Sequence, residues 1–340
     1  MHVDGYTFMA DTVAKFHHSV YVTGWFRHDH DGLASASMIG PGIVAQVARV
    51  GLVHPSVEPE VLPGRAFTLQ AVREETTFPD DLGIAFVTHA GRRIEANLLA
   101  LSAERLAQSA TARLYHQFID MVMGMDRPRV IDIGGRNRSD YDRGRDFPGT
   151  SYVVVDILPG ENVDIVADAH ALSDHLAPES ADAVIAAATF EHLLMPWKAV
   201  VEINRVLKPG GIACVISHQT LGLHDMPWDF WRFSADAWDA LFNRYTGFEI
   251  LERAMAQEQF VIPFFYRHAM DIAEKSAGFE FSGVIARKIG PARVDWPVPL
   301  AEIISTRYPT DGDDGRRRAR WSRRAREARH VRRAVGPLER

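Results

Sequence analysis

The chain has little cysteine and no long apolar run. Cys214, in the apolar run IACVIS, is the only cysteine of the 340 residues. One cysteine excludes a disulfide within the chain and a zinc site built on cysteines. No run approaches the roughly 18 consecutive apolar residues of a membrane-spanning helix. The first residues, MHVDGYTFMADTV, lack the basic and apolar stretches of a signal peptide. We therefore expect Cys214 in the core and a cytoplasmic location.

Positive charge is concentrated in one segment. Residues 316–340 hold 11 arginines against Glu327 and Glu339, a local charge of +9, while the whole chain carries −6. The remaining body is therefore acidic, and we expect no nucleic-acid partner. The segment also spaces Trp321 and Val335 among its arginines. It predicts either a peripheral contact with an anionic membrane or a merely solvated tail.

The length leaves room for about two domains. Residues 19–101 hold short β-rich runs separated by Gly, Pro and Asp, which predict a small antiparallel sandwich. From about Ser102, helical spacing in AERLAQSATARLYHQFIDMVM predicts one long helix that leads into a second domain. We expect a β-rich accessory domain over 1–103, a catalytic domain over 104–290, and a linker with the Arg-rich tail over 291–340.

Strands and helices alternate in the second domain. Strands are predicted at RVIDI, SYVVVDI, VDIVAD, ADAVIAA and GIACVIS, with a helix over 191–207 before the last of them. Helices near 235–243 and 265–275 precede strands at FEILERA and FEFSGVIARK. This alternation predicts an α/β fold with a mostly parallel sheet. Open sheets of this kind bind ligands at the carboxyl ends of their strands.

A glycine turn follows the first of these strands. The strand ends in Asp132 and turns through Gly134 and Gly135, where missing side chains let the backbone approach a ligand. Arg136 stands at the second glycine position of G-x-G-x-x-G, so a nicotinamide cofactor is disfavoured. A plain strand-to-helix turn is the alternative.

Acids close the next two strands. Asp156 ends SYVVVD about 20 residues after the glycine turn, where a carboxylate accepts hydrogen bonds from ribose hydroxyls. Asp168, followed by Ala169, ends the third strand. One such acid is explained by a helix cap. Two at consecutive strand ends indicate a ligand site.

The segment FEHLLMPWKAVVEINRVLKPGG follows the fourth strand. Together with the glycine turn and the two acids, it resembles the class I S-adenosylmethionine-dependent methyltransferases that carry E-H-x(n)-L-K-P-G-G. The resemblance implies a Rossmann-like, seven-stranded sheet and S-adenosylmethionine as cofactor. The cofactor-binding residues that it implies are Asp132, Gly134 and Gly135 at the methionine moiety, Asp156 at the ribose, Asp168 and Ala169 at the adenine, and Thr189 and Glu191 on the methyl-donor side.

An aromatic loop follows the fifth strand. Its sequence, HDMPWDFWRF, resembles a stretch of methyltransferases often associated with bacterial surface-polysaccharide and envelope biosynthesis. The resemblance implies that the loop borders the acceptor pocket, with Trp228, Asp229, Trp231 and Arg232 as acceptor contacts, since aromatic planes suit sugar faces. The alternative is a structural lid in which the aromatic residues are core and Asp229 pairs with Arg232.

Three histidines are candidates for a general base. Methyl transfer is an in-line displacement, in which positioning supplies roughly 7–11 kcal/mol and a base about 10²–10⁴-fold. If the acceptor is a hydroxyl, His192, His218 and His224 are candidates to take its proton. We prefer His224, because it opens the aromatic loop.

Metal-ligand residue types also occur together at His28, Asp29, His30 and Asp31. These residues are adjacent on one segment, and the following Gly32 favours a hairpin turn there. We therefore predict no metal site.

The expected function is O-methylation of a sugar or glycan precursor, with the β-rich domain serving recognition or assembly. One alternative acceptor is a small metabolite or a lipid-linked headgroup, methylated at oxygen or nitrogen. Another alternative is a non-catalytic glycan- or partner-binding protein that only senses the cofactor. The intact acids Asp132, Asp156 and Asp168 favour an enzyme, whereas Arg136 keeps the last alternative open.

Overall fold

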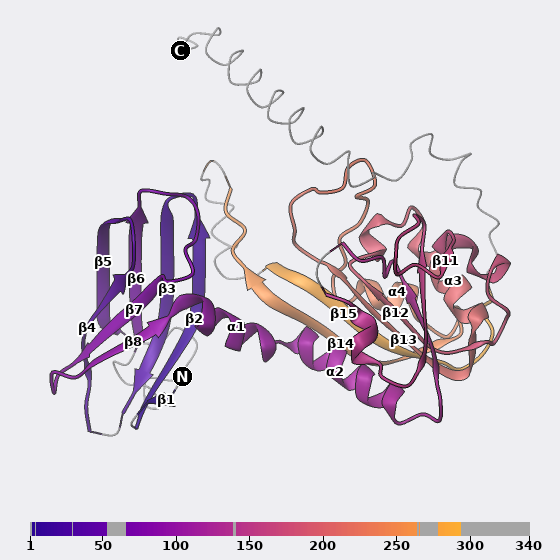
Figure 1. Ribbon diagram of the computed structural model, residues 1–340, viewed down its shortest axis with the longest axis horizontal. Helices are drawn as coiled ribbons and strands as arrows, with labels where there is room; N and C mark the ends of the chain where they lie inside the picture. The colour runs from indigo at the N-terminus through magenta and orange to yellow at the C-terminus, as the bar shows by residue number, and fades with distance from the viewer. Residues whose placement is uncertain are drawn as a thin grey trace, which may run out of the picture. The chain divides into compact units, whose positions relative to one another are not determined.

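The computed structural model describes residues 2–3, 5–28, 30–52, 66–138, 141–263, 265 and 278–293. The chain divides into two compact units, residues 1–108 and 109–340 (Figure 1). The linker beyond residue 293, the Arg-rich tail and all but the first residue of the helix expected over 265–275 lie outside the described residues. Among those described, no helix combines the length and apolar character needed to cross a membrane.

The first unit is an all-β region that ends in one helix. A five-stranded sheet and a three-stranded sheet, both antiparallel, share one core. Phe8 and Phe67 of the larger sheet contact Phe86 of the smaller one, with ring centroids 4.5 Å and 5.1 Å apart. The larger sheet has the order β1 (His2–Val3), β2 (Tyr6–Phe16), β3 (Ser19–Arg27), β6 (Ala66–Arg73) and β5 (Ile43–Leu52), and the smaller one the order β4 (Leu33–Ile39), β7 (Gly83–Thr88) and β8 (Arg93–Asn97).

The hairpin turn expected at residues 28–31 is wrong, because β3 and β4 belong to different sheets. Asp31 anchors this connection between the sheets. Its Oδ2 accepts a hydrogen bond from the Tyr6 hydroxyl at 3.0 Å, and its Oδ1 accepts one from the backbone N–H of Gly32 at 2.8 Å. A hydrogen bond with Thr88, together with these two, lowers the pKa of Asp31 to about 2.

The single long helix expected after residue 102 is also wrong. The segment forms two helices, α1 (Leu98–Ala107) and α2 (Ala110–Met123). The Ser109 hydroxyl accepts a hydrogen bond from the backbone N–H of Ala112 at 3.2 Å and so caps α2. A serine offers the backbone this alternative to continued helix, which outweighs the apolar period across the break.

The second unit contains a mixed sheet of seven strands. The first five are parallel and the last two antiparallel, which confirms the prediction of a mostly parallel sheet. In sheet order the strands are β11 (Ile165–Val166), β10 (Ser151–Asp156), β9 (Arg129–Ile133), β12 (Ala181–Ala187), β13 (Leu207–His218), β15 (Gly278–Lys288) and β14 (Phe248–Gln259). Two strands, β9 and β12, match the predicted bounds of RVIDI and ADAVIAA.

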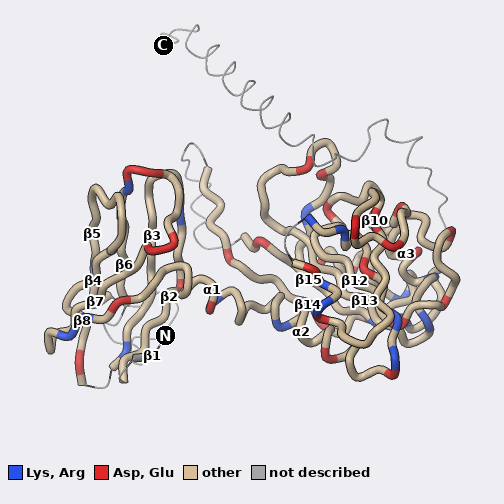
Figure 2. Tube along the Cα trace, in the orientation of Figure 1, with Lys and Arg blue, Asp and Glu red and all other residues tan. Residues whose placement is uncertain are grey.

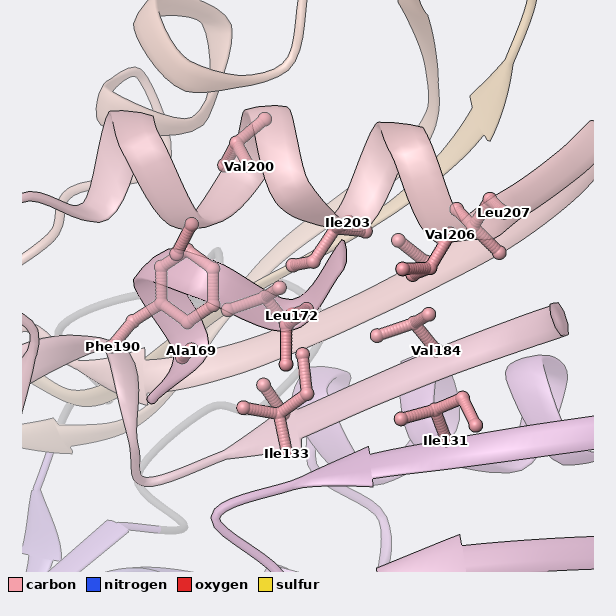
Figure 3. Packing of buried hydrophobic residues seen from close by; sticks show 14 of the residues in the cluster. Ile131, Ile133, Ala169, Leu172, Val184, Phe190, Val200, Ile203, Val206 and Leu207 are labelled. Atoms are coloured by element: carbon pink, nitrogen blue, oxygen red, sulfur yellow. The ribbon is translucent and has the colours of Figure 1, made fainter. Parts of the chain in front are cut away.

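Helices cover both faces of this sheet. On one face lie α3 (Pro196–Val206), α4 (Ala237–Leu241) and the 3₁₀ helix η2 (Ala169–Asp174). On the other face α2 packs against a cluster that contains Cys214, which is fully buried as expected. Figure 3 shows the first cluster, with Val200, Ile203 and Val206 of α3 near Ile131, Ile133 and Val184 of the sheet.

The helix predicted over 191–207 is shorter than expected. Residues Phe190–His192 form a 3₁₀ turn, η3, and α3 starts only at Pro196. Proline disfavours a helical backbone at the residue before it, so Met195 is not helical and the helix starts at the proline itself. The helix ends at Val206, and the KPGG segment lies within β13. The helix expected near 235–243 is likewise reduced to α4.

Candidate functional site

Two adjoining cavities lie where β9, β10, β12 and β13 end. The strand-end cavity is lined mainly by residues that follow β9, β10 and β11. The histidine cavity, of about 450 Å³, is lined by side chains that include Glu191, His218, His224 and Asp225. Acidic and basic residues are intermixed along the second unit (Figure 2). The residues that line both cavities are Gly134, Arg136, Arg138, Ala188 and His192.

Asp156 and Asp168 both line the strand-end cavity, at the ends of adjacent strand segments. Asp156 accepts a hydrogen bond through Oδ1 from the backbone N–H of Leu158 at 2.9 Å. Oδ1 of Asp168 accepts a hydrogen bond from the backbone N–H of His170 at 2.9 Å, so Asp168 caps η2. No described residue forms a hydrogen bond with Oδ2 of either acid. Two carboxylate oxygens therefore remain to accept hydrogen bonds from a ligand.

His170 fixes the position of Asp168. The backbone N–H of Met195 donates to Nε2 of His170 at 3.1 Å, so Nε2 accepts and the ring proton is on Nδ1. Nδ1 donates to Oδ1 of Asp168 at 2.6 Å. This chain links the third strand end to the start of α3. Sequence reasoning did not identify His170, although it stands two residues after the acid.

The two motif glycines are required by the protein's own packing. Gly134 has φ +74°, and a Cβ there would lie 2.2 Å from Oγ1 of Thr189. A Cβ on Gly135 would lie 2.3 Å from Oδ2 of Asp132. The turn therefore packs tightly on β9 and on the residues after β12. Gly134, Thr189 and Ala169 line the strand-end cavity.

Asp132 lies beneath the glycine turn and lines neither of the two cavities. It is almost fully buried, and it accepts hydrogen bonds from Arg143 and from the Tyr152 hydroxyl, the latter at 2.7 Å. Burial raises the pKa of Asp132, although Arg143 works against this. Asp132 thus holds the turn from below. Arg143 lies on the short 3₁₀ helix η1 (Arg143–Asp146), and no sequence signal pointed to it.

Glu191 is the most buried acid of the site, with no exposed surface. Its Oε2 accepts a hydrogen bond from the Ser217 hydroxyl at 2.6 Å, and its Oε1 lies 3.3 Å from Nε2 of His218. Oε1 forms no hydrogen bond with any described residue. Glu191 lines the histidine cavity and not the strand-end cavity.

The three predicted histidines come together at the histidine cavity. The His224 ring lies 4.9 Å from that of His192 and 5.4 Å from that of His218, measured between centroids. Nδ1 of His192 donates to the carbonyl oxygen of Trp228 at 2.6 Å. Burial lowers the pKa of His218, although Glu191 works against this, so its imidazole is held neutral. Residues from three separate segments thus form one cluster.

The polar side chains of the aromatic loop bond to the protein itself. Arg232 donates to both carboxylate oxygens of Asp229, at 2.6 Å and 2.9 Å, and the Asp229 side chain has no exposed surface. Nε1 of Trp231 donates to the carbonyl oxygen of Leu193 at 2.9 Å. Asp229, Trp231 and Arg232 line neither cavity, whereas Trp228 lines the strand-end cavity. These contacts favour the lid interpretation of the loop.

An ion pair that sequence reasoning missed joins two sides of the histidine cavity. Arg138, after the glycine turn, forms two hydrogen bonds with the carboxylate of Asp225. This pairing lowers the pKa of Asp225 below its usual range. The residues are far apart in the sequence, so only the fold shows the pair.

The lining of the strand-end cavity fits an adenosine group. Two acids offer free carboxylate oxygens for hydroxyl and amino groups, and apolar side chains such as Ile133, Val155 and Leu193 offer surface for a base. The Rossmann rule places nucleotide ligands at this edge of the sheet.

Comparisons with known proteins agree with this geometry. Residues 150–215 match a family model described as a methyltransferase domain. No curated protein matches the chain. The region matched by the family model includes both cavity-lining acids, Thr189, Glu191 and the KPGG segment.

Solved structures that match about half of this chain include three bacterial or archaeal proteins. An S-adenosylmethionine-dependent methyltransferase from Archaeoglobus fulgidus is 18% identical, with 54% of this chain and 94% of that chain covered and a TM-score of 0.38. The YcgJ protein from Bacillus subtilis is 16% identical, with 52% and 98% covered and a TM-score of 0.38. A putative methyltransferase from Bacillus halodurans is 14% identical, with 52% and 98% covered and a TM-score of 0.38. The family match lies within the second unit and its mixed seven-stranded sheet, and the protein is a methyltransferase that uses S-adenosylmethionine as its cofactor.

Proposed function

We propose that the protein transfers the methyl group to a hydroxyl of a polar acceptor, such as a sugar or a glycan precursor, bound in the histidine cavity. One observation carries this proposal: a cavity lined by arginine, histidine, asparagine, tyrosine and acidic side chains adjoins the strand-end cavity, which Asp156 and Asp168 line. An acceptor with many hydroxyls can pair with such a lining, whereas an apolar acceptor would leave it unsatisfied.

The cofactor supplies a methyl group on a sulfonium sulfur. In this proposal Asp156 holds the ribose through Oδ2 and Asp168 accepts a hydrogen bond on the adenine side. Gly134 and Ala188 line both cavities, and Thr189 lines the strand-end cavity. The acceptor oxygen bonds to the methyl carbon while the carbon–sulfur bond breaks, and that electron pair stays on sulfur. The hydroxyl proton leaves to the cavity lining or to water.

The histidine cluster is where that proton would be handled. His192, His218 and His224 surround the same end of the cavity, next to the buried Glu191. Orientation of the acceptor is expected to contribute more than proton removal, because displacement at a sulfonium methyl needs alignment first. The histidines are therefore proposed to orient the acceptor hydroxyl as well as to receive its proton.

We keep two alternatives to this function as proposals. A small metabolite or a lipid-linked headgroup would use the same cavity with a different outer contact. Glycan or partner binding without catalysis would leave the cluster unused. We further propose that the first unit serves recognition or assembly, and that residues 316–340 contact an anionic membrane from the cytoplasmic side.

The test is methyl transfer from cofactor labelled in its methyl group to extracts and to panels of sugars, nucleotide sugars and small hydroxylated metabolites. We expect label in a carbohydrate product, located on oxygen by mass spectrometry. Label on nitrogen, or only in small non-carbohydrate products, would contradict the proposed acceptor and favour a small metabolite or a lipid-linked headgroup. Binding of S-adenosylhomocysteine with no labelled product would favour the non-catalytic alternative.

A further inference from the structure

We propose that Glu191, His218 and His224 form a binding site for a divalent transition-metal cation, with Zn²⁺ as the best-fitting ion, at the wall of the histidine cavity. One carboxylate oxygen and two imidazole nitrogens of these residues all lie within 4.8 Å of one another. Zinc bonds to such ligands at about 2.0–2.2 Å, so a small inward shift of the rings closes the site. His224 can make that shift because its side chain is about one-third exposed.

An unpartnered carboxylate oxygen points to a cation. Oε1 of Glu191 is buried and forms no hydrogen bond with a described residue, and it faces the nitrogen of His218 at 3.3 Å. A buried carboxylate costs several kcal/mol of desolvation unless positive charge compensates it. Among the described residues, only imidazoles lie within ion-pair distance of Glu191.

The arginines around the cavity are committed to other acids. Arg138 pairs with Asp225, and Arg143 pairs with Asp132. Arg232 is held by both oxygens of Asp229. Each pair is nearly balanced in charge, so the carboxylate of Glu191 is left as the local negative charge that a cation would neutralise.

Neighbouring groups orient the proposed ligands, as groups around metal sites do. The Ser217 hydroxyl donates to Oε2 of Glu191 and turns Oε1 toward the histidines. The backbone N–H of His224 donates to Oδ2 of Asp229 at 2.9 Å. The ion pair of Asp229 and Arg232 thus positions His224. In this proposal the aromatic loop orients a metal ligand and does not contact the acceptor.

The ligand types select the ion. Two imidazoles and one carboxylate suit Zn²⁺ and its first-row neighbours, whereas Mg²⁺ and Ca²⁺ prefer oxygen ligands alone. Three protein ligands beside an open cavity leave a coordination position for a small molecule. There the cation would bind the acceptor oxygen and lower the pKa of its hydroxyl, and His192 or water, instead of the two liganding histidines, would receive the proton. This role rests on the proposed function, but the binding of the cation does not.

The sequence alone predicts no metal site. Its one cluster of metal-ligand types, residues 28–31, has its carboxylate Asp31 bonded to Tyr6 and Gly32. The ligands proposed here come from three places: η3, the end of β13 and the aromatic loop. No spacing along the chain could have indicated them.

The experiment is calorimetric titration of the full-length, metal-free protein with ZnCl₂ alone, together with elemental analysis after dialysis. We expect one Zn²⁺ per chain from this site. His224→Ala and His218→Ala should each weaken its binding by at least about 100-fold. His116→Ala, an exposed histidine on α2, is the matched control and should change nothing. Binding of S-adenosylhomocysteine, measured on each variant, shows that the variant is folded.

Two results overturn the proposal. One is no Zn²⁺ binding by the parent at up to about 100 μM, a concentration that detects even weak sites. The other is Zn²⁺ binding that His218→Ala and His224→Ala leave unchanged, which would assign the ion to a different part of the chain. Because neither measurement needs an acceptor, failure to find a methylated product would contradict the proposed function and leave the metal site standing.

Discussion

Nε of Arg136 lies 3.6 Å from Oδ1 of Asp156, and both side chains are about nine-tenths buried. The stem of Arg136 packs so closely on Gly160 that a Cβ there would lie 2.8 Å from Cγ of the arginine. Arg136 stands where related turns have a second glycine, and here it supplies positive charge to the acid at the end of β10. The free Oδ2 of Asp156 is the oxygen left for a ligand.

Asp156→Ala should weaken the binding of S-adenosylhomocysteine. The change removes a charged hydrogen-bond acceptor from the cavity wall, so we expect a loss of about 1.5–3 kcal/mol. Calorimetry measures this directly, with Glu161→Ala as the control because Glu161 is an exposed acid on the same loop. If NAD binds more tightly than S-adenosylhomocysteine, the cofactor assignment of this cavity is wrong.

Glu202→Gln should lower the stability of the second unit at neutral pH. Glu202 is almost fully buried and accepts hydrogen bonds from Lys198 at 2.8 Å and from the Ser173 backbone and hydroxyl at 2.8 Å and 2.6 Å. The bonds to Ser173 tie α3 to η2, which carries Asp168 at its start. We expect a loss of about 2–3 kcal/mol in the free energy of unfolding at pH 7.

The loss should depend on pH in a defined direction. Burial raises the pKa of Glu202, but its hydrogen bonds outweigh this and hold the pKa below the usual value. A lowered pKa stabilises the fold above the unfolded value of about 4.3, and this contribution disappears as the pH falls through the folded value. Urea unfolding at pH 7 and near pH 3 should therefore show a difference between parent and variant that shrinks in acid. Glu249→Gln, in an exposed pair with Arg287, should cost less than about 0.5 kcal/mol.

Arg232→Ala tests the lid interpretation of the aromatic loop. Without the arginine, the fully buried carboxylate of Asp229 loses both of its guanidinium hydrogen bonds, so we expect a loss of about 3–5 kcal/mol in stability. The loop also supplies Trp228 to the strand-end cavity, so cofactor affinity should fall together with acceptor affinity. Arg253→Ala removes an exposed pair and serves as control. A raised KM for the acceptor with unchanged melting temperature and cofactor affinity would instead favour direct acceptor contact.

The sequence predicts the parts of this molecule that depend on local pattern. RVIDI and ADAVIAA are short, mostly apolar runs, and β9 and β12 have those bounds. The acids at consecutive strand ends line one cavity because parallel strands bring their carboxyl ends together. The break at Ser109 and the late start at Pro196 are also local, but the apolar period across them gave the opposite indication.

Other parts of the site depend on residues that only the fold brings together. Arg143 and Tyr152 hold Asp132 from two different elements, and Ser217 reaches Glu191 across 26 positions of sequence. No periodicity or spacing encodes such contacts. The sequence could predict only that the three histidines lie near the ends of neighbouring strands. It could not predict that their rings meet.

Gly134→Ala separates a steric requirement from a conformational one, because the chain offers a matched control. Gly134 and Gly149 have nearly the same backbone, with φ +74° and +77°. A Cβ on Gly149 would meet nothing within 4 Å, whereas one on Gly134 would lie 2.2 Å from Oγ1 of Thr189. Gly149→Ala should therefore lower the free energy of unfolding by only the cost of placing alanine in a left-handed backbone, about 1–2 kcal/mol.

Gly134→Ala should cost more and should also reduce cofactor binding. The backbone N–H of Gly134 donates to the carbonyl oxygen of Val155 at 2.7 Å, so the turn cannot retreat without breaking that bond. Thr189 must then move, although its hydroxyl donates to the carbonyl oxygen of Ile133 at 3.2 Å. Adding Thr189→Ala removes the two closest atoms and should restore part of the lost stability. Unfolding and S-adenosylhomocysteine titration on all four variants, including Thr189→Ala alone, decide the question: equal losses in Gly134→Ala and Gly149→Ala would mean that the contact with Thr189 does not constrain the turn.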